Sequence, residues 1–270
     1  MEETIMLTML IENERWLAFA QAMVSGLCVL LVIMASRRLK IYLVKETVIA
    51  MLRGIVQIVV VGSILLTMFA APTWASLLIL AVMITAASFM GAARLKNFSG
   101  GVPIFLFGVA ISSVATIGSM VLLGVIAWET KALVPLGSMI IANTMNTNIL
   151  GLERFRSEVS SHHGMVETAL ALGAKPEIAV APYVQSAINA SLIPQVNSLR
   201  SLGIVWIPGA MSGLVLAGAD PVYAAFYQFV VVAMIYVAAN IASVISILLM
   251  RKRIFSKAMQ LLLNTDGTLA

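Results

Sequence analysis

Residues 47–92 decide the class of fold, and they read TVIAMLRGIVQIVVVGSILLTMFAAPTWASLLILAVMITAASFMGA. Two apolar runs stand on either side of the short connection AAPTW. Each run has the length of about 20 residues that a helix needs to cross roughly 30 Å of hydrocarbon. Arg53 is the single charged residue in the stretch. The stretch therefore predicts a tight hairpin of two membrane-spanning helices.

The whole chain extends this pattern. Its 270 residues are 61% hydrophobic and 11% charged, with a mean hydropathy of +1.02, which lies far outside the usual range of soluble domains. Apolar windows can be drawn at Trp16–Ala35, Thr47–Ala70, Trp74–Ala92, Val102–Trp128, Val134–Leu150, Leu202–Gly218 and Val222–Met250. We expect an all-α integral membrane protein with about seven transmembrane helices, in a single transmembrane domain over residues 1–270.

Lys and Arg are distributed unevenly between the alternate connections. One side receives 14 of the 17 basic residues: Arg37, Arg38, Lys40, Lys45, Arg94, Lys96, Arg154, Arg156, Lys175, Arg200, Arg251, Lys252, Arg253 and Lys257. Only Arg15 and Lys131 fall on the other side. Because cytoplasmic loops carry the excess of Lys and Arg, the N-terminus is predicted outside and the C-terminus in the cytoplasm.

Several classes of function are disfavoured. The net charge of +5 comes from basic clusters beside apolar runs, which indicates contact with lipid headgroups and not with nucleic acid. His162 and His163 are adjacent and lack the i, i+4 spacing of a zinc-binding helix. No Gly is followed by Lys, so a phosphate-binding loop is excluded. We predict no catalytic residues and no cofactor on this chain, and the metal ligands stay unknown.

Residues 151–201 form the longest predicted connection, with moderate hydrophobicity, helical periodicity and several Gly and Pro breaks. Within it, Glu167, Ala169 and Gly173 have the spacing E-x-A-x-x-x-G, which resembles the loop by which ABC permeases dock their ATPase. A helix reaching Leu172 can stop at Gly173, and Pro176 prevents its continuation. The resemblance implies a cytoplasmic coupling segment, whose predicted contact residues are Glu167, Ala169, Gly173, Lys175 and Glu177.

Longer stretches resemble a permease family. They are LRGIVQIVVVG (52–62), NTMNTNILGLERF (143–155), ETALALGA (167–174) and GIVWIPGAMSGLVLAGADP (203–221), followed by YQ at 227–228. Together they are similar to the FetB-type permeases of bacterial iron exporters, whose plant relatives include aluminium-tolerance proteins. The resemblance implies two permease chains and two separate ABC ATPase chains in the bacterial inner membrane. The ATPases would bind ATP and Mg²⁺, and the complex would export iron or a related metal species.

Polar residues inside apolar windows are candidates for the substrate pathway. Asn143 and Asn146 share one helical face, which lines either a pathway or a seam between helices. Arg53 and Gln57 lie at i, i+4 on the second window. In one interpretation Arg53 extends to the headgroups and Gln57 bonds to a neighbouring helix. In the other they face an inner vestibule, where a guanidinium would repel a bare cation and attract an anionic complex, or Arg53 anchors a structural network.

The sixth window is predicted to be kinked or broken. Pro208 lacks an N–H donor, and Gly209 and Gly213 permit local unwinding. Met211 could present a thioether there, or fill the core. The remaining predicted pathway residues are Met145 and Gln228.

Two alternatives stay open. An ion- or proton-coupled secondary carrier would act without an ATPase, although such carriers usually place carboxylates within the membrane and none is securely placed here. ABC export of a nucleotide sugar or another anionic solute is the second alternative.

Overall fold

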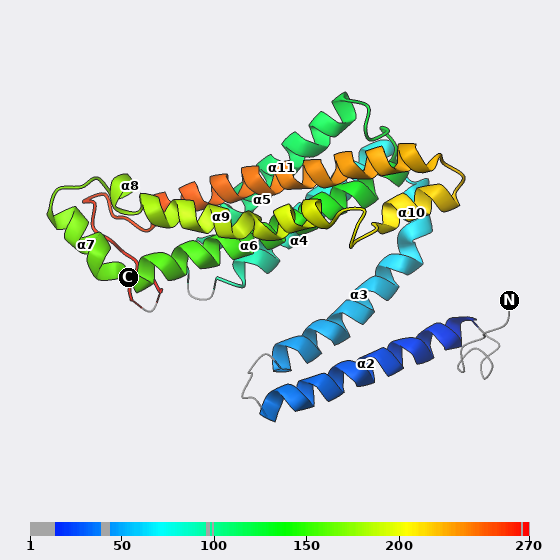
Figure 1. Ribbon diagram of the computed structural model, residues 1–270, viewed down its shortest axis with the longest axis horizontal. Coiled ribbons are helices and arrows are strands. Elements are labelled where there is room, and N and C mark those ends of the chain that lie inside the picture. The colour runs from blue at the N-terminus through cyan, green and yellow to red at the C-terminus, as the bar shows by residue number, and fades with distance from the viewer. Residues whose placement is uncertain (1–13, 39–43, 96–97, 99, 266, 270) are drawn as a thin grey trace. The chain divides into compact units, whose positions relative to one another are not determined.

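The computed structural model describes residues 14–38, 44–95, 98, 100–265 and 267–269. The helices of this part of the chain are α2 (Glu14–Arg38), α3 (Val44–Ala70), α4 (Thr73–Ala92), α5 (Gly101–Leu122), α6 (Thr130–Ser161), α7 (His163–Ala171), α8 (Pro176–Ala179), α9 (Ala181–Ser201), α10 (Gly209–Leu216) and α11 (Pro221–Arg253) (Figure 1). Within it, β pairing is confined to isolated bridges. The predicted all-helical class is therefore confirmed. The basic residues Lys40 and Lys96 lie outside the described residues.

Five of the described helices, α2, α3, α4, α5 and α11, are long and apolar enough to cross a membrane. The chain is a multi-pass membrane protein. It divides into two compact units, Met1–Phe69 and Ala70–Ala270. The first unit contains α2 and nearly all of α3, and apolar side chains such as Val56, Ile58 and Leu66 are exposed along α3. A helix that is apolar all round must be covered by lipid or by other helices.

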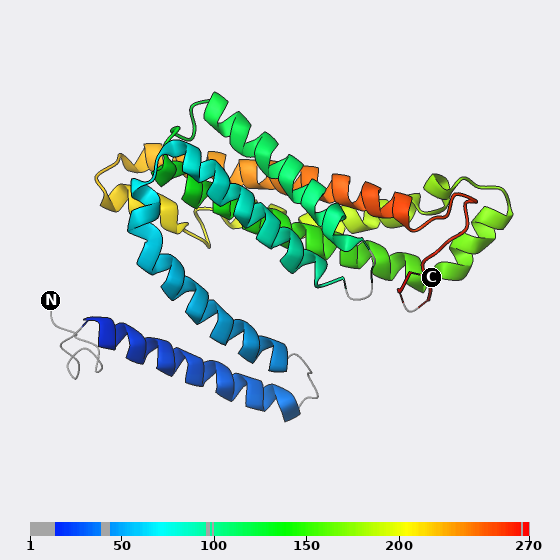
Figure 2. The same ribbon diagram turned by 180° about the vertical axis from the view of Figure 1, so that it is seen from behind.

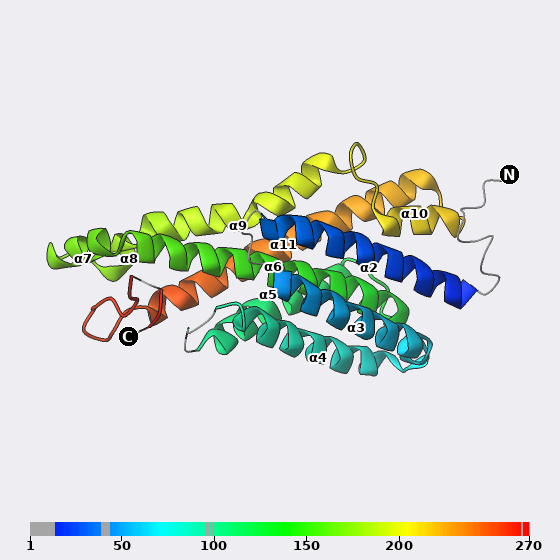
Figure 3. The ribbon, with the colours of Figure 1, turned by 90° about the horizontal axis from the view of Figure 1, so that it is seen from below.

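Helix α6 is the centre of the second unit. It contacts α4, α5, α9 and α11 along its length. Figure 1 shows α9 and α11 running beside it from the end with α7 and α8 to the end with α10, and Figure 3 shows α6 between α9 and α4. Helix α6 thus lies between the apolar helices α4, α5 and α11 and the more polar α9, so its polar side chains can face other helices and not lipid.

Helices α4 and α5 cover another side of α6 (Figure 2). The start of α4 is joined to the start of α6 by the Thr130 hydroxyl, which donates to Ala71 O at 3.2 Å. Gly137 lets α4 and α6 approach closely, because a Cβ there would lie 2.6 Å from Leu80 Cδ2. Without a hydrophobic force between helices in lipid, such small residues allow the packing that holds the bundle together.

The end of the bundle with α7 and α8 has an apolar core of its own. Phe155 of α6, Val166 of α7 and Val180 after α8 are buried there with Leu263 of the C-terminal residues 254–269. Phe255 bridges to Leu261 and Leu263 to Leu269, and the Arg156 Nε donates to Gly267 O at 2.6 Å. This C-terminal tail therefore holds α7 and the end of α6 in place.

The structure redraws the predicted segment 151–201. Residues 151–161 continue α6, residues 162–180 contain α7 and α8, and α9 returns along α6 and α11. The hydropathy windows left α9 outside the bundle, because the polar residues of α9 lower the mean hydropathy of its sequence. The bundle instead accommodates them between two neighbouring helices.

The window at Leu202–Gly218 is broken, as predicted, and the break lies at residues 202–208. After Ser201 the chain turns at Gly203, with φ 78°, and α10 begins only at Gly209. The N–H groups of Ile204, Val205 and Trp206 all point to Ser201 O, at 3.0–3.2 Å. The predicted fourth window was also too long, since α5 ends at Leu122.

The predicted position of Arg200 also needs correction. It was grouped with the cytoplasmic basic residues, but it lies in the last turn of α9, at the opposite end of that helix from Lys175. Lys175 shares a pocket with Arg251 and Lys252 at the end of α11, whereas Arg200 lies beside Tyr236.

Candidate functional site

The polar residues of α6 and α9 meet inside the bundle. The Gln195 Nε2 of α9 donates to Asn143 Oδ1 at 3.5 Å and to Thr147 Oγ1 at 3.4 Å, both at the long end of the hydrogen-bond range. Asn143 also donates its Nδ2 to Met139 O, one turn back, at 2.9 Å. Gln195 and Thr147 are buried, and Asn143 is half-buried. We call these three residues the Gln195 seam.

A second polar contact joins α9 to α11. The Ser191 and Ser243 hydroxyls lie 2.8 Å apart, and both are fully buried. Gly151 of α6 faces them, because a Cβ at Gly151 would lie 3.1 Å from Ser243 Oγ and 3.3 Å from Ser191 Cβ. Three helices therefore meet at this point around small residues.

Asn148 is buried without a hydrogen-bond partner for either of its amide atoms. Its Nδ2 faces Gly108 of α5, where a Cβ would lie 2.9 Å away. Thr144, one turn earlier, has a buried and unpartnered hydroxyl, as do Ser113 and Thr116 of α5. A buried amide or hydroxyl without a partner costs about 1–3 kcal/mol. These groups, which lie outside the Gln195 seam, would gain free energy if water or a polar solute reached them.

Several predicted pathway residues lie elsewhere. Asn146 is exposed on α6, and Met145 is half-buried against the apolar core. Gln228 of α11 is 1% exposed, and neither of its amide atoms has a partner. Met211 is half-buried on α10.

Arg53 and Gln57 belong to α3, in the first unit, and both are exposed. Their spacing of one turn places them on the same side of that helix. In the sixth window, Pro208 caps α10, Gly209 is its first residue and Gly213 lies within it. The break therefore falls before Pro208 and not at Gly213.

Sequence reasoning missed Thr147, Asn148 and Gln195. The pattern Thr144, Thr147, Asn148 marks a second polar face of α6, at i, i+3 and i+4, which the more obvious asparagine pair concealed. Gln195 was hidden because its helix had been placed outside the bundle.

The predicted coupling residues lie together at the end formed by α7 and α8. Gly173 has φ 89°, as expected, and Ala174 N bonds to Ala169 O at 3.0 Å while Gly173 N bonds to Leu170 O at 2.9 Å. This pair of bonds closes the C-terminus of α7 in a Schellman motif. Glu167 faces His163, with 3.4 Å between Oε2 and Nδ1.

The chain beyond α7 is equally well defined. Lys175 is the N-cap of α8 and precedes Pro176, while Glu177 lies in its first turn. Met165, Leu172 and Ile178 expose 65%, 84% and 65% of their surface. An exposed apolar set flanked by charges is typical of a protein interface.

The described part of the chain contains no preformed site for a metal ion. No group of three or more His, Cys, Asp or Glu side chains is placed there to hold an ion. His162 instead stacks on Tyr183, with 5.0 Å between ring centroids, and its Nδ1 lies 2.9 Å from Glu158 O. These contacts give His162 a structural role.

Replacing Gln195 with leucine should lower the free energy of unfolding by about 0.5–1.5 kcal/mol, because Asn143 and Thr147 each lose a partner. Thermal unfolding of the detergent-solubilised protein measures the loss. Gln185→Leu is the matched control, since Gln185 is exposed on the same helix. Equal losses in both variants would contradict a role for the seam.

A family model described as "Uncharacterised protein family (UPF0014)" matches residues 19–255. The chain is 35% identical over 219 residues to a UPF0014 membrane protein of Synechocystis, covering 78% of this chain and 83% of that protein. It is 30% identical to the protein ALUMINUM SENSITIVE 3 of Arabidopsis thaliana, covering 86% of each. It is 29% identical to the probable iron export permease protein FetB of Escherichia coli, covering 87% of this chain and 92% of that protein. No solved structure matches.

Proposed function

The chain belongs to the UPF0014 family of membrane proteins, and from this premise we propose that it is the permease subunit of an ATP-driven ABC transporter that exports iron or a related metal species. The observation that carries the proposal is its similarity, over 87% of its length, to a protein named as a probable iron export permease. ATP and Mg²⁺ are bound by a separate ATPase chain, and two copies of the permease pair in the bacterial inner membrane.

The α7–α8 end supports this assignment, because an ATPase needs a firm contact on the permease. Val166 and Val180 anchor the segment in the core, while Met165, Leu172 and Ile178 remain exposed. Glu167, Ala169, Gly173, Lys175 and Glu177 provide the shape and charge of the contact. Apolar side chains supply affinity, and the charges set the register of the partner.

We assign seven spans to α2, α3, α4, α5, α6, α9 with α10, and α11. The sixth span is then a broken helix of the kind that transporters place beside a substrate. Arg94, Arg156, Lys175 and Arg251 line pockets at the α7–α8 end, which is therefore assigned to the cytoplasm.

Single cysteines test this topology in a Cys28→Ser background. Val222→Cys, at the start of α11, should react with a membrane-impermeant maleimide added to intact cells, because it faces outward. Lys257→Cys should react only after the membrane is opened. Both side chains are exposed. The reverse pattern would overturn the orientation.

The proposed route passes along the Gln195 seam, which contains Asn143. The residues Asn146, Met145, Gln228 and Met211 lie outside the seam and stay predicted pathway residues, as do Arg53 and Gln57 of α3 in the first unit. Buried amides without partners can exchange to a passing solute at little cost, since they lose no protein hydrogen bond. Such polar groups in a membrane protein face the bundle interior or a wet cavity.

The deciding experiment reconstitutes the permease in liposomes with and without its ATPase. We expect ATP hydrolysis and iron release only when both chains are present. Other metals and nucleotide sugars serve as competing substrates, and a nucleotide sugar that competes would redirect the substrate assignment. Transport by the permease alone, driven by an ion gradient, would establish the secondary carrier instead.

A further inference from the structure

A groove between α9 and α11 carries an exposed arginine, Arg200. It has a volume of about 280 Å³ and is lined by Asn189, Asn197 and Arg200 of α9, by apolar residues of the same helix, and by Tyr236 of α11. Asn197 lies about two turns after Asn189, and Arg200 about one turn after Asn197, so all three lie on one face of α9. This face is distinct from the one that carries Gln195, which is buried against α6.

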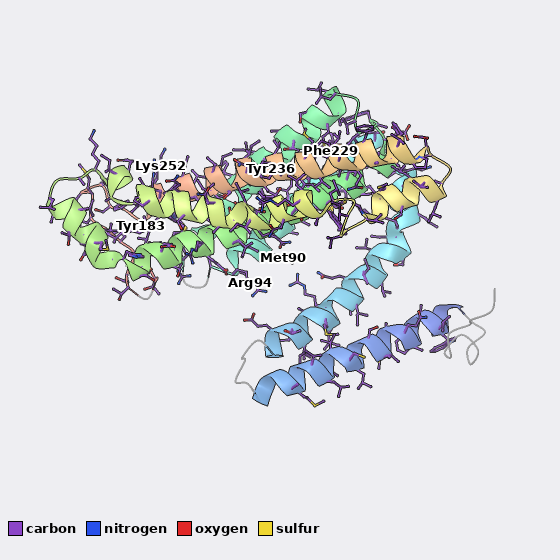
Figure 4. All side chains as sticks on the ribbon, in the orientation of Figure 1. Met90, Arg94, Tyr183, Phe229, Tyr236 and Lys252 are labelled. Atoms are coloured by element: carbon purple, nitrogen blue, oxygen red, sulfur yellow. The ribbon has the colours of Figure 1, made fainter. Side chains whose placement is uncertain are left out.

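The groove lies at membrane depth. Tyr236 is near the middle of α11, as Figure 4 shows, and Lys252 marks the basic end of that helix. Fifteen residues separate Tyr236 from Arg251, or about 22 Å of helix. With Arg251 at the headgroups, Tyr236 and the neighbouring Arg200 lie within a hydrocarbon layer of roughly 30 Å, in the half farther from Arg251.

Arg200 has no protein counter-charge in the structure as described. No hydrogen bond or ion pair joins it to another residue, and α9 and α11 contain no Asp or Glu. The only compensation nearby is the C-terminus of its own helix, whose partial negative charge falls off within one turn. A guanidinium at this depth is stabilised by water, by an anion, or by lipid headgroups where its side chain reaches them.

The chain directly after Arg200 also indicates a wet environment. Residues 202–208 are not helical, and irregular backbone at membrane depth is tolerated where it is covered by protein or lines a water-filled cavity. The groove and this turn are adjacent in the chain. Two independent features therefore place polar groups that need water at the same level of the bundle.

From this arrangement we infer that the groove is the binding site for an anionic solute that carries carboxylate or phosphate groups. The guanidinium offers a planar fork for two oxyanion oxygens, and the Asn189 and Asn197 amides and the Tyr236 hydroxyl add donors. A bare metal cation is repelled. The inference rests on the proposed transport function and narrows its substrate: a metal crosses as an anionic chelate.

The test measures the charge preference of the groove directly. Val196→Cys, in a Cys28→Ser background, places a thiol one turn from Arg200 inside the groove. The full chain in nanodiscs is reacted with an anionic methanethiosulfonate that bears a sulfonate, and with a cationic one that bears a trimethylammonium. Adding Arg200→Gln should lower the anionic-to-cationic rate ratio by about tenfold, since one charge at contact distance changes each rate severalfold even in water.

Controls separate charge from folding. Arg200→Lys should keep the ratio, because it keeps the charge. Lys131→Gln removes one positive charge from an exposed position at the start of α6 and should leave the ratio unchanged. The inference is overturned if neither reagent reacts, which would mean that the groove faces lipid. It is equally overturned if Arg200→Gln leaves the ratio unaltered.

Protection experiments then identify the oxyanion. Ferric citrate supplies carboxylates, uridine diphosphate glucose supplies phosphates, and free ferrous ion is the cationic comparison. We expect one of the two anions, and not ferrous ion, to slow the labelling of Val196→Cys by at least about fivefold at saturation. Protection by ferrous ion alone would contradict the inference. Co-purification of the ATPase is measured on the same samples. Failure of the ATPase to co-purify would contradict the proposed transport function, whereas unchanged labelling would contradict only the anion site.

Discussion

Replacing Gly173 with valine is expected to separate the permease from its ATPase while leaving it in the membrane. Gly173 closes α7 with φ 89°, a conformation that a β-branched residue adopts at a cost of about 1–3 kcal/mol. Apart from its two chain neighbours, no residue has an atom within 4 Å of a Cβ placed there, so the effect comes from the backbone and not from a clash. The strain is relieved by unwinding the turn, which moves Leu172 and Lys175 relative to each other. Each 1.4 kcal/mol lost from the contact weakens ATPase binding about tenfold.

Two variants isolate this cause. Gly164→Val changes a glycine within α7 that also has open space around it and no left-handed backbone, so it should retain the ATPase. Gly173→Asn should recover part of the binding, since asparagine tolerates the left-handed region better than valine does. Pull-down of the ATPase by tagged permease measures all three. Full retention by Gly173→Val would show that the contact lies elsewhere, and crosslinks from the loop after Arg94 would then locate it.

Gly108→Val is expected to destabilise the bundle more than any other single substitution considered for this protein. A Cβ at Gly108 would overlap Ser246 Oγ of α11 and lie 2.9 Å from Asn148 Nδ2 of α6. Ser246 cannot retreat freely, because its hydroxyl donates to Ile104 O at 3.3 Å and is buried. Overpacking of this kind costs about 1–3 kcal/mol or more. The loss should appear as a lower unfolding temperature and as aggregation in size-exclusion chromatography.

The same helix provides the matched comparison. Gly118 is also in α5, and a Cβ there meets nothing within 4 Å. Gly118→Val should therefore leave the unfolding temperature close to that of the wild type. The smaller pair Gly108→Ala with Ser246→Gly removes the overlap and should restore most of the stability that Gly108→Ala loses. If both valine variants behave alike, helix propensity and not close packing explains the result.

Hydropathy predicted the elements that face lipid and failed on those that face protein. The windows at Thr47–Ala70 and Trp74–Ala92 correspond closely to α3 and α4, because an apolar residue in lipid needs no partner. Helix α9 was placed outside the bundle, because Gln195 and Ser191 lower its hydropathy while their partners, Thr147 and Ser243, are far away in sequence. A single window cannot register a bond that closes over about fifty residues.

The candidate site divides in the same way. Gly173 was found because the left-handed stop of a helix is a local property that glycine and the following proline reveal. Asn148 was missed because its burial depends on Gly108, in another helix. The spacing of asparagines pointed to Asn146, which the structure leaves exposed. Which of several polar residues lies inside a bundle is decided by neighbouring helices and not by the helix that carries them.

The polarity of α9 also bears on how the chain is made. Helix α9 is not among the helices apolar enough to cross a membrane, and its neighbours in the bundle are α6, synthesised before it, and α11, synthesised after it. A segment of this kind does not partition alone from the translocon into lipid. If α9 crosses the membrane as proposed, we expect it to enter together with α11, whose Ser243 contacts Ser191 of α9. On the proposed topology, insertion of the second unit would therefore not follow the order of its sequence, because α9 would enter the membrane as late as α11.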